Sequence, residues 1–212
     1  TKAYYAHLND HRNRLHTEFS ALSFLWEKGV RAIPQPLYKN TEKNLAVYSH
    51  IEGERIIPKD ITEKDIDGAI SFLSSINLLQ KKTGDFLKAS DACFCAQDYI
   101  NIIKRRLDHL LETANDTLLK QKLHHFLQEE YLPYLKETIP AIQKMLSKIG
   151  YKLDTEIKEK ILSPSDFGFH NALRLPDGNL AFLDFEYCGW DDPVKTISDF
   201  ILHPGMQLNE NL

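Results

Sequence analysis

Apolar residues recur at helical spacing near the start of the chain, at Leu15, Phe19, Leu22 and Trp26. Steps of three or four residues place these side chains on one face of a helix. Gly29 follows the last of them and is a residue that commonly ends a helix. The pattern therefore predicts an amphipathic helix over residues 10–28.

The segments on either side of this helix have strand-like patterns. Residues 1–7 are rich in aromatic side chains and predict a strand. The Ile-Pro-Gln-Pro sequence at 33–36 requires an extended connection, because a proline disfavours helical geometry in the residue before it. Residues 37–40 and 44–51 then predict two paired strands across a polar turn.

From Thr62 onward the pattern becomes strongly helical. Thr62 is followed three residues later by Asp65, which resembles a capping signal at a helix start. The apolar positions that follow it are Ile66, Ile70, Leu73 and Ile76. Helical segments are expected to continue, with breaks, to about residue 148.

The last third of the chain returns to short strands. Residues 172–175 and 180–183 predict two strands, and the Pro-Asp-Gly-Asn sequence between them predicts a tight turn. Asp192 precedes Pro193, and proline is favoured at the first position of a helix. We expect a final helix to begin there.

Composition narrows the class of protein. A chain of 212 residues with 42% apolar residues suits one large domain or two small lobes. The net charge of −4 argues against a dedicated nucleic-acid-binding protein. No apolar run approaches the roughly 20 residues of a membrane span. The three cysteines have no zinc-site spacing and indicate a reducing cytoplasm. Nothing in the pattern sets the oligomeric state.

The candidate chemistry lies around the predicted hairpin. Asp166 and Asn171 form a D-x-x-x-x-N loop before it, and Asp184 opens a D-F-E tripeptide after it. This order matches the catalytic aspartate, the metal-binding asparagine and the metal-binding aspartate of a phosphoryl-transfer site. The alternative is a surface hairpin flanked by solvated acids. We favour the catalytic interpretation because loop, hairpin and second acid occur in the required order.

Two further positions fit phosphoryl transfer. A lysine on a strand can hold nucleotide phosphates when a glutamate on the next helix pairs with it. Lys2 and Glu18 occur in this order, although a surface lysine and an exposed glutamate are the simpler explanation when taken alone. The strand that ends near Tyr48 suits a hinge, where the carbonyl of Ser49 and the amide of Ile51 would contact adenine. A strand end in an ordinary turn is the alternative there.

With these residues in place, the chain resembles the aminoglycoside phosphotransferase and choline kinase superfamily of small-molecule kinases. The resemblance runs from Lys2 and Glu18 through residues 33–37 and 48–53 to Asp166, Asn171 and the sequence Asp-Phe-Glu-Tyr at 184–187. It also includes Gly-Trp-Asp-Asp-Pro at 189–193 and the Asp-Phe pair at 199–200. It thus covers nearly the whole sequence.

The resemblance implies an α+β, protein-kinase-like bilobal fold. Residues 1–53 would form an N-lobe with the hinge, incomplete because the Gly-rich turn is absent, and residues 54–212 a mainly helical C-lobe with a catalytic β-hairpin. It also implies ATP and Mg²⁺ as cofactors. Asp166 would be the catalytic base, Asn171 and Asp184 would bind magnesium, and Lys2 with Glu18 would position phosphate.

Several positions depart from the family pattern. Pro164 stands where the family usually has a histidine, two residues before the catalytic aspartate, and Thr196 stands where many members have a further aspartate. We also expect this chain to be a fragment, because relatives usually continue with helices beyond the equivalent of Leu212. His170 is a second candidate base, but Asp166 fits the motif better, so we expect His170 to pack the loop or face solvent.

The predicted activity is transfer of the γ-phosphoryl group of Mg-ATP to a hydroxyl of a small molecule, such as an aminoglycoside, an amino alcohol or a sugar-like metabolite. Four acids after the hairpin, with only Lys195 to balance them, favour a cationic acceptor: Glu186, Asp191, Asp192 and Asp199. Helix capping and structural hydrogen bonds are the alternative for these acids. A catalytically weak or inactive pseudokinase is the competing functional hypothesis. A protein kinase is disfavoured because no A-P-E-like segment follows Asp184.

Overall fold

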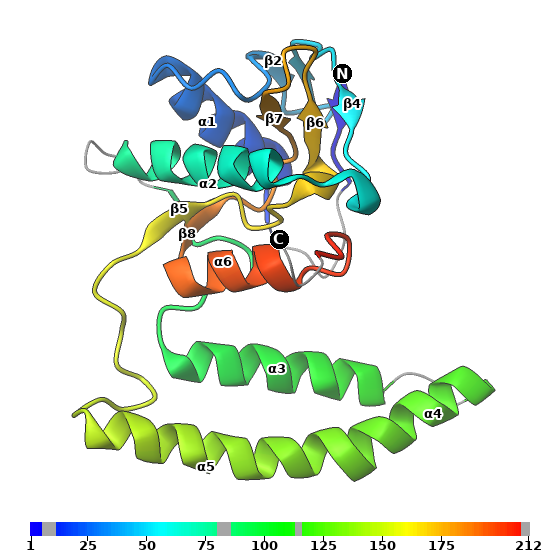
Figure 1. Cartoon of the computed structure of the whole chain (residues 1–212), viewed down its shortest axis with the longest axis vertical. Coiled ribbons are helices and arrows are strands. Elements are labelled where there is room, and N and C mark those ends of the chain that lie inside the picture. Colours follow the sequence, from blue (N-terminus) through cyan, green and yellow to red (C-terminus); the bar gives the residue numbers. More distant parts are fainter. Residues whose placement is uncertain (6–11, 80–85, 113–115, 209–212) are drawn as a thin grey trace. The chain divides into compact units, whose positions relative to one another are not determined.

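The computed structural model describes residues 1–5, 12–79, 86–112 and 116–208. The chain forms two compact units (Figure 1). The first joins Thr1–Ala92 to Glu159–Leu212, and the second is Cys93–Lys158. This division does not test the lobe boundary expected at residue 53, which stays a prediction. All residues of the candidate site belong to the first unit.

The described part of the first unit contains three small antiparallel sheets. Their strands are β1 (Lys2–Ala3), β2 (Pro36–Asn40), β3 (Leu45–Tyr48), β4 (Glu54–Arg55), β5 (Ile161–Ser163), β6 (Ala172–Arg174), β7 (Leu180–Phe182) and β8 (Gly189–Asp191). The strand orders are β1-β3-β2, β4-β6-β7 and β5-β8. The paired strands expected across the polar turn are β2 and β3, so that prediction is confirmed.

The first helix, α1, spans Arg14–Glu27 and starts later than the pattern predicted. The reason is local, because the side chain of Asn13 accepts a hydrogen bond from the amide of His16 and caps the helix there. Gly29, with a φ of 91°, follows its end as expected. The expected first strand is confirmed only at β1, and residues 6–11 lie outside the described residues.

The second helix, α2, spans Glu63–Leu78 and confirms the capping signal. The Thr62 side chain accepts from the Asp65 amide, and the Asp65 carboxylate accepts from the Thr62 amide. This reciprocal pair satisfies two backbone groups that a helix start leaves without partners.

The predicted hairpin is β6 and β7, which pair in antiparallel register from Ala172–Phe182 to Arg174–Leu180. Its turn uses Gly178 at a φ of 79°, a value that glycine adopts without strain. The pattern missed β4, which pairs with β6, and the short β5–β8 ladder, because strands of two or three residues are too brief to show alternation. The final helix, α6 (Pro193–Leu202), begins after Asp192, as expected.

The second unit confirms the helical middle of the chain. It consists of α3 (Ala96–Leu111), α4 (Leu118–Phe126), a π-helical turn at Leu127–Tyr131 and α5 (Leu132–Lys148). Leu107, Leu127 and Leu135 form the buried centre of this unit. In the part of the chain that the structure describes, no helix is both long and apolar enough to cross a membrane.

An aromatic core lies beneath the candidate site. Phe72 of α2 stacks on Phe182 of β7 with ring centroids 4.4 Å apart, and Phe167 lies 4.9 Å from Phe182. Phe185 and Phe200 complete the contacts, from the segment after β7 and from α6. Burial of such rings dominates core energetics, so this cluster fixes where the loops beside it begin.

Helix α2 is joined to the hairpin by an ion pair. Asp65, only 2% exposed, accepts two hydrogen bonds from the guanidinium of Arg174 on β6, at 2.7 and 3.2 Å. Burial alone would raise the pKa of Asp65, but the hydrogen bonds from Arg174 and Thr62 outweigh it and hold the pKa below its usual value of 3.8. The contribution of this pair to stability is therefore present above about pH 4 and is lost as the pH falls through the folded-state pKa.

We predict that Asp65→Ala lowers the free energy of unfolding by about 2–3 kcal/mol at neutral pH, because it removes charged hydrogen bonds and a helix cap. Urea denaturation between pH 7 and pH 3 measures this. The difference from wild type should shrink at the acid end of the range. Asp67→Ala, at an exposed position of the same helix, is the control and should change stability little. A difference that stays constant down to pH 3 contradicts the assignment.

Candidate active site

Two loops of strained backbone carry the candidate catalytic acids. Ser165, next to Asp166, has a φ of 73°, and Asp184 itself has a φ of 64°. Non-glycine residues rarely adopt positive φ, and such strain often accompanies functional sites. Each acid is followed by a buried phenylalanine of the aromatic core, Phe167 or Phe185. The buried phenylalanines therefore fix the position of both loops against the aromatic core.

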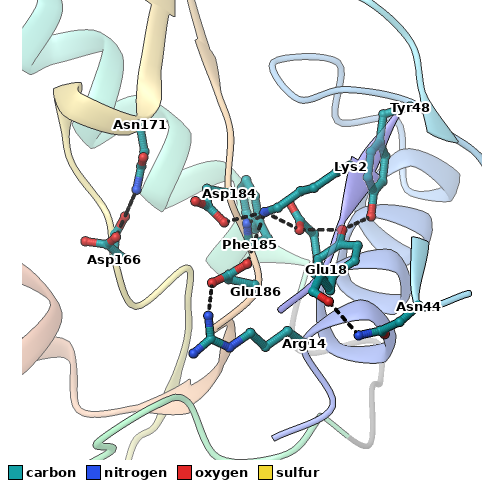
Figure 2. Close-up of polar contacts among 11 residues, drawn as sticks. Lys2, Arg14, Glu18, Asn44, Tyr48, Asp166, Asn171, Asp184, Phe185 and Glu186 are labelled. Carbon is teal, nitrogen blue, oxygen red and sulfur yellow. Dashed lines mark hydrogen bonds and ion pairs between the residues drawn. The ribbon is translucent and has the colours of Figure 1, made fainter. Parts of the chain in front are cut away.

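Asp166 and Asn171 contact each other across the predicted loop (Figure 2). The Asn171 side chain donates through Nδ2 to the carbonyl of Asp166 at 2.9 Å and to its Oδ2 at 3.1 Å. This arrangement leaves the amide oxygen of Asn171 as an acceptor. The Asp166 side chain remains 39% exposed, so its carboxylate is accessible to a substrate.

Lys2 lies at the centre of a cluster of carboxylates (Figure 2). Its Nζ is 2.7 Å from Glu18 Oε2, 2.7 Å from Asp184 Oδ1 and 3.2 Å from Glu186 Oε2. The ion pair expected between the strand lysine and the helix glutamate is therefore present. Asp184 joins the same cluster, and the amide of Leu183 just before it donates to the Asn171 carbonyl at 2.8 Å. The backbone on either side of the hairpin is therefore joined by a hydrogen bond next to both predicted metal-binding residues, Asn171 and Asp184.

Glu18 is the buried member of this cluster, with 3% exposure. Besides Lys2, it accepts a hydrogen bond from the Tyr4 hydroxyl at 2.6 Å and one from the amide of Phe185 at 3.2 Å. The Tyr4 hydroxyl also lies 2.6 Å from the hydroxyl of Tyr48. Buried charges are tolerated when they are paired and hydrogen-bonded, and Glu18 meets that condition.

The charges of the cluster shift the pKa values of its members. Burial lowers the pKa of Lys2, but the charge of Glu18 and the hydrogen bonds to Asp184 and Glu18 outweigh this, so the pKa lies above its ordinary value. Burial raises the pKa of Glu18, against the opposing effect of Lys2. Burial and the charge of Glu18 raise the pKa of Tyr4, and burial raises that of Tyr48 to about 12. Both phenols are therefore hydrogen-bond donors at neutral pH.

Sequence reasoning missed three contributors to this cluster. Arg14, at the first turn of α1, donates to Glu186 Oε1 at 2.9 Å. Tyr4 and Tyr48 form the hydroxyl chain to Glu18. The sequence offered one weak signal for the two tyrosines. Tyr4 lies near Lys2 and Tyr48 near the predicted hinge, both in segments predicted as strands, but an aromatic residue at such a position is equally typical of a core.

The predicted metal ligands, Asp184 and Asn171, offer the oxygen atoms that Mg²⁺ prefers. Carboxylate oxygens of Glu18, Asp184 and Glu186 lie within 4.8 Å of one another. In this structure Lys2 pairs with all three carboxylates and Arg14 pairs with Glu186. Asp184 and Asn171 remain the predicted ligands.

The predicted hinge residues lie between β3 and β4. The Ser49 amide donates to the Gln35 carbonyl at 2.9 Å, and the Ser49 hydroxyl accepts from the Gln35 amide at 2.8 Å. These bonds hold the backbone of this segment beside Gln35, the residue that precedes β2. The adenine contacts of Ser49 and Ile51 stay a prediction.

The other acids after the hairpin have partners within the described residues. Asp192 caps α6 by accepting from the Val194 amide at 2.8 Å. Lys195 lies 3.4 Å from Asp191 and pairs with Asp199. Glu186 is bound by Lys2 and Arg14, as described above. The capping and structural roles named as the alternative therefore account for these acids.

His170 is exposed, in agreement with the expectation that it packs the loop or faces solvent. Its Nε2 also lies 3.0 Å from Asp166 Oδ1, and its ring stacks on that of His203. These two contacts were not predicted. His203 was missed because it lies 33 residues further along the chain, in a segment without a motif.

Comparisons with known proteins agree with this geometry at the level of the fold. No family model matches the sequence, and no curated protein matches it. Among solved structures, a choline kinase from Cryptosporidium parvum Iowa II aligns with 93% of this chain at a TM-score of 0.61 and 15% identity. Choline kinase LicA from Streptococcus pneumoniae aligns with 99% of it at a TM-score of 0.61 and 16% identity. The ADP-bound aminoglycoside phosphotransferase APH(2'')-Ib aligns with 88% at a TM-score of 0.54 and 21% identity.

The chain has the fold of these small-molecule kinases. It spans 53%, 62% and 59% of the lengths of the three solved chains, respectively. The expected kinase-like α+β fold and the resemblance to this superfamily are thus confirmed as a matter of fold. The similarity of fold does not assign roles to individual residues. The predicted roles therefore rest on the geometry of Lys2, Glu18, Asp166, Asn171 and Asp184, and they remain predictions.

We predict that Tyr4→Phe lowers the free energy of unfolding by about 1.5–3 kcal/mol, because it removes a hydrogen bond to a buried charge while keeping the ring. Chemical denaturation followed by circular dichroism measures the change. Tyr38→Phe, at an exposed position of β2, is the matched control. Equal stability of the two variants would show that the Tyr4 hydroxyl does not support Glu18.

Proposed function

We propose that this protein transfers the γ-phosphoryl group of Mg-ATP to a hydroxyl of a small molecule. The observation that carries the proposal is the meeting of Lys2, Glu18 and Asp184 at distances of 2.7 Å, although they come from a strand, a helix and the segment after the hairpin. Phosphoryl transfer relies on positioning and on charge rather than on covalent chemistry by the protein. A cluster of this kind provides both.

Each residue has a distinct role in the proposal. Asp166 accepts the proton of the acceptor hydroxyl and orients it towards the phosphate. Lys2 binds phosphate oxygens, and Glu18 fixes the position of its ammonium group. Asn171 and Asp184 would hold magnesium. When bound, that ion would neutralise charge on the phosphates.

The nucleotide end of the site is proposed at the segment after β3. There the carbonyl of Ser49 and the amide of Ile51 would contact the adenine edge. The hydrogen bonds between Ser49 and Gln35 support this placement, because they fix the backbone that would present both groups. We also propose a cytoplasmic location, since Cys93, Cys95 and Cys188 are thiols in the structure.

The acceptor is proposed at the level of chemical class. The similar solved structures include choline kinases, an ethanolamine kinase and aminoglycoside phosphotransferases. An amino alcohol, an aminoglycoside or a related hydroxylated metabolite is therefore the class to test first. A positive charge on the acceptor stays a prediction, because the acids that suggested it have structural partners.

We predict that Asp166→Ala lowers kcat by about 10²–10⁴-fold while ATP still binds in the presence of magnesium, because Asp166 acts on the acceptor. Asp184→Ala should weaken the binding of Mg-ATP itself, because Asp184 acts on the metal. Phosphorylation of choline, ethanolamine and gentamicin gives the first readout, and calorimetric titration with Mg-ATP gives the second.

Asp177→Ala is the matched control, since Asp177 is an exposed acid in the turn of the same hairpin. Equal loss of nucleotide affinity in the Asp166 and Asp184 variants contradicts the division of roles. A wild-type protein that binds Mg-ATP but phosphorylates none of a broad panel of hydroxylated metabolites supports the pseudokinase alternative.

A further inference from the structure

The catalytic loop is held by a segment that follows α6. Met206, fully buried, accepts a hydrogen bond through its sulfur from the Phe169 amide at 3.0 Å. The ring of His203 stacks on the ring of His170, with centroids 4.1 Å apart and planes 9° apart. Two residues of the segment 203–206 thus contact two consecutive residues of the loop that carries Asp166.

The contacts converge on the Asp166 carboxylate. Its Oδ2 accepts from Asn171 at 3.1 Å, and its Oδ1 lies 3.0 Å from His170 Nε2. His203 Nε2 is 3.7 Å from the same Oδ1, which is too long for a direct hydrogen bond but close enough for electrostatic attraction. Each carboxylate oxygen is therefore held from one side, while the side chain remains accessible.

The proton positions on the two rings follow from their partners. The amide of Gly205 donates to His203 Nδ1 at 3.0 Å, so Nδ1 carries a lone pair and the neutral ring has its proton on Nε2. A carboxylate oxygen is a hydrogen-bond acceptor, so the 3.0 Å contact between Asp166 Oδ1 and His170 Nε2 assigns the donor role to that nitrogen. Both rings therefore direct an N–H towards Asp166.

This proton arrangement separates two interpretations of the cluster. Asp166, His170 and His203 have ligand atoms within 4.8 Å of one another, a grouping that also occurs in metal sites. A histidine that ligates a metal needs an unprotonated nitrogen facing the ion, and its other nitrogen normally donates. In His203 the far nitrogen accepts instead, which favours an N–H donor over a metal ligand.

The His170 ring has two close neighbours. One face contacts His203, and a side chain at Gly168 would come within 2.7 Å of His170 Nδ1. Glycine at 168 therefore leaves room for the ring beside His203. In this position Nε2 lies 3.0 Å from Asp166 Oδ1.

We propose that His170 is a positioning residue for Asp166, and that His203 holds His170 in place by stacking. The inference rests on the proposed function, in which Asp166 acts on the acceptor hydroxyl. By donating to Oδ1, His170 fixes the rotation of the carboxylate, so that its remaining lone pairs face the acceptor. Misplacement of a reacting group by about 1 Å can cost about 10²-fold in rate.

The first test measures kcat and the KM for ATP in the full-length protein, with choline, ethanolamine or gentamicin as acceptor. His170→Ala and His203→Ala should each lower kcat by about 10–100-fold and leave the KM for ATP unchanged. His170→Gln, which keeps an N–H donor, and His203→Phe, which keeps a stacking ring, should recover most of the loss. His125→Ala, on the exposed side of α4, is the control.

Failure of both conservative variants to recover activity overturns the proposal, as does a rise in the KM for ATP that matches the fall in kcat. The second test does not depend on turnover. Nitrogen-15 NMR of labelled histidines should place the proton of neutral His170 and His203 on Nε2, and Asp166→Ala should shift His170 but not His125. A proton on Nδ1 of His203, or an unchanged His170 signal, overturns the proposal even if no acceptor is phosphorylated. Absence of turnover with the expected NMR result instead contradicts the proposed function alone.

Discussion

The buried charge of Glu18 constrains the whole candidate site. A carboxylate with 3% exposure is costly unless donors surround it, and here the donors come from Lys2, Tyr4 and the amide of Phe185. These three partners belong to the first strand, to the residue after it and to the segment after the hairpin. Satisfying one buried charge therefore requires residues 2–4 and the segment at 184–185 to meet at α1, and this meeting brings Asp184 beside Lys2.

The aromatic core positions the two acids that remain accessible to solvent. Asp166 and Asp184 each precede a buried phenylalanine, and the rings of Phe167 and Phe185 pack with Phe72 of α2. The backbone strain at Ser165 and Asp184 is tolerated because a buried phenylalanine follows within two residues. Burial of the rings thus stabilises the loop geometry that exposes the carboxylates.

The sequence predicted the parts of this arrangement that local chemistry determines. The Thr62 cap, the Asp-Gly hairpin and the helix after Asp192 each follow from a few neighbouring residues, and all three were found. The ladder of β5 with β8 was not predicted, because its strands have three residues each and lie far apart in the sequence, at 161–163 and 189–191. Arg14 and His203 were missed for a related reason. An arginine at a helix start or a histidine in a loop acquires a role only from a partner that is distant in sequence.

The ion pairs of Lys2 would change when metal and nucleotide bind. In this structure Lys2 contacts Asp184 at 2.7 Å, so the residue proposed to bind phosphate is paired with the residue proposed to bind the metal. A divalent cation at Asp184 would compete with the ammonium group, and phosphate oxygens would offer that group new partners. Glu18, bound also by Tyr4 and by the Phe185 amide, would retain Lys2 at its present position during this exchange. Lys2 therefore has one fixed partner, the buried Glu18, and one partner that ligands could displace, the half-exposed Asp184.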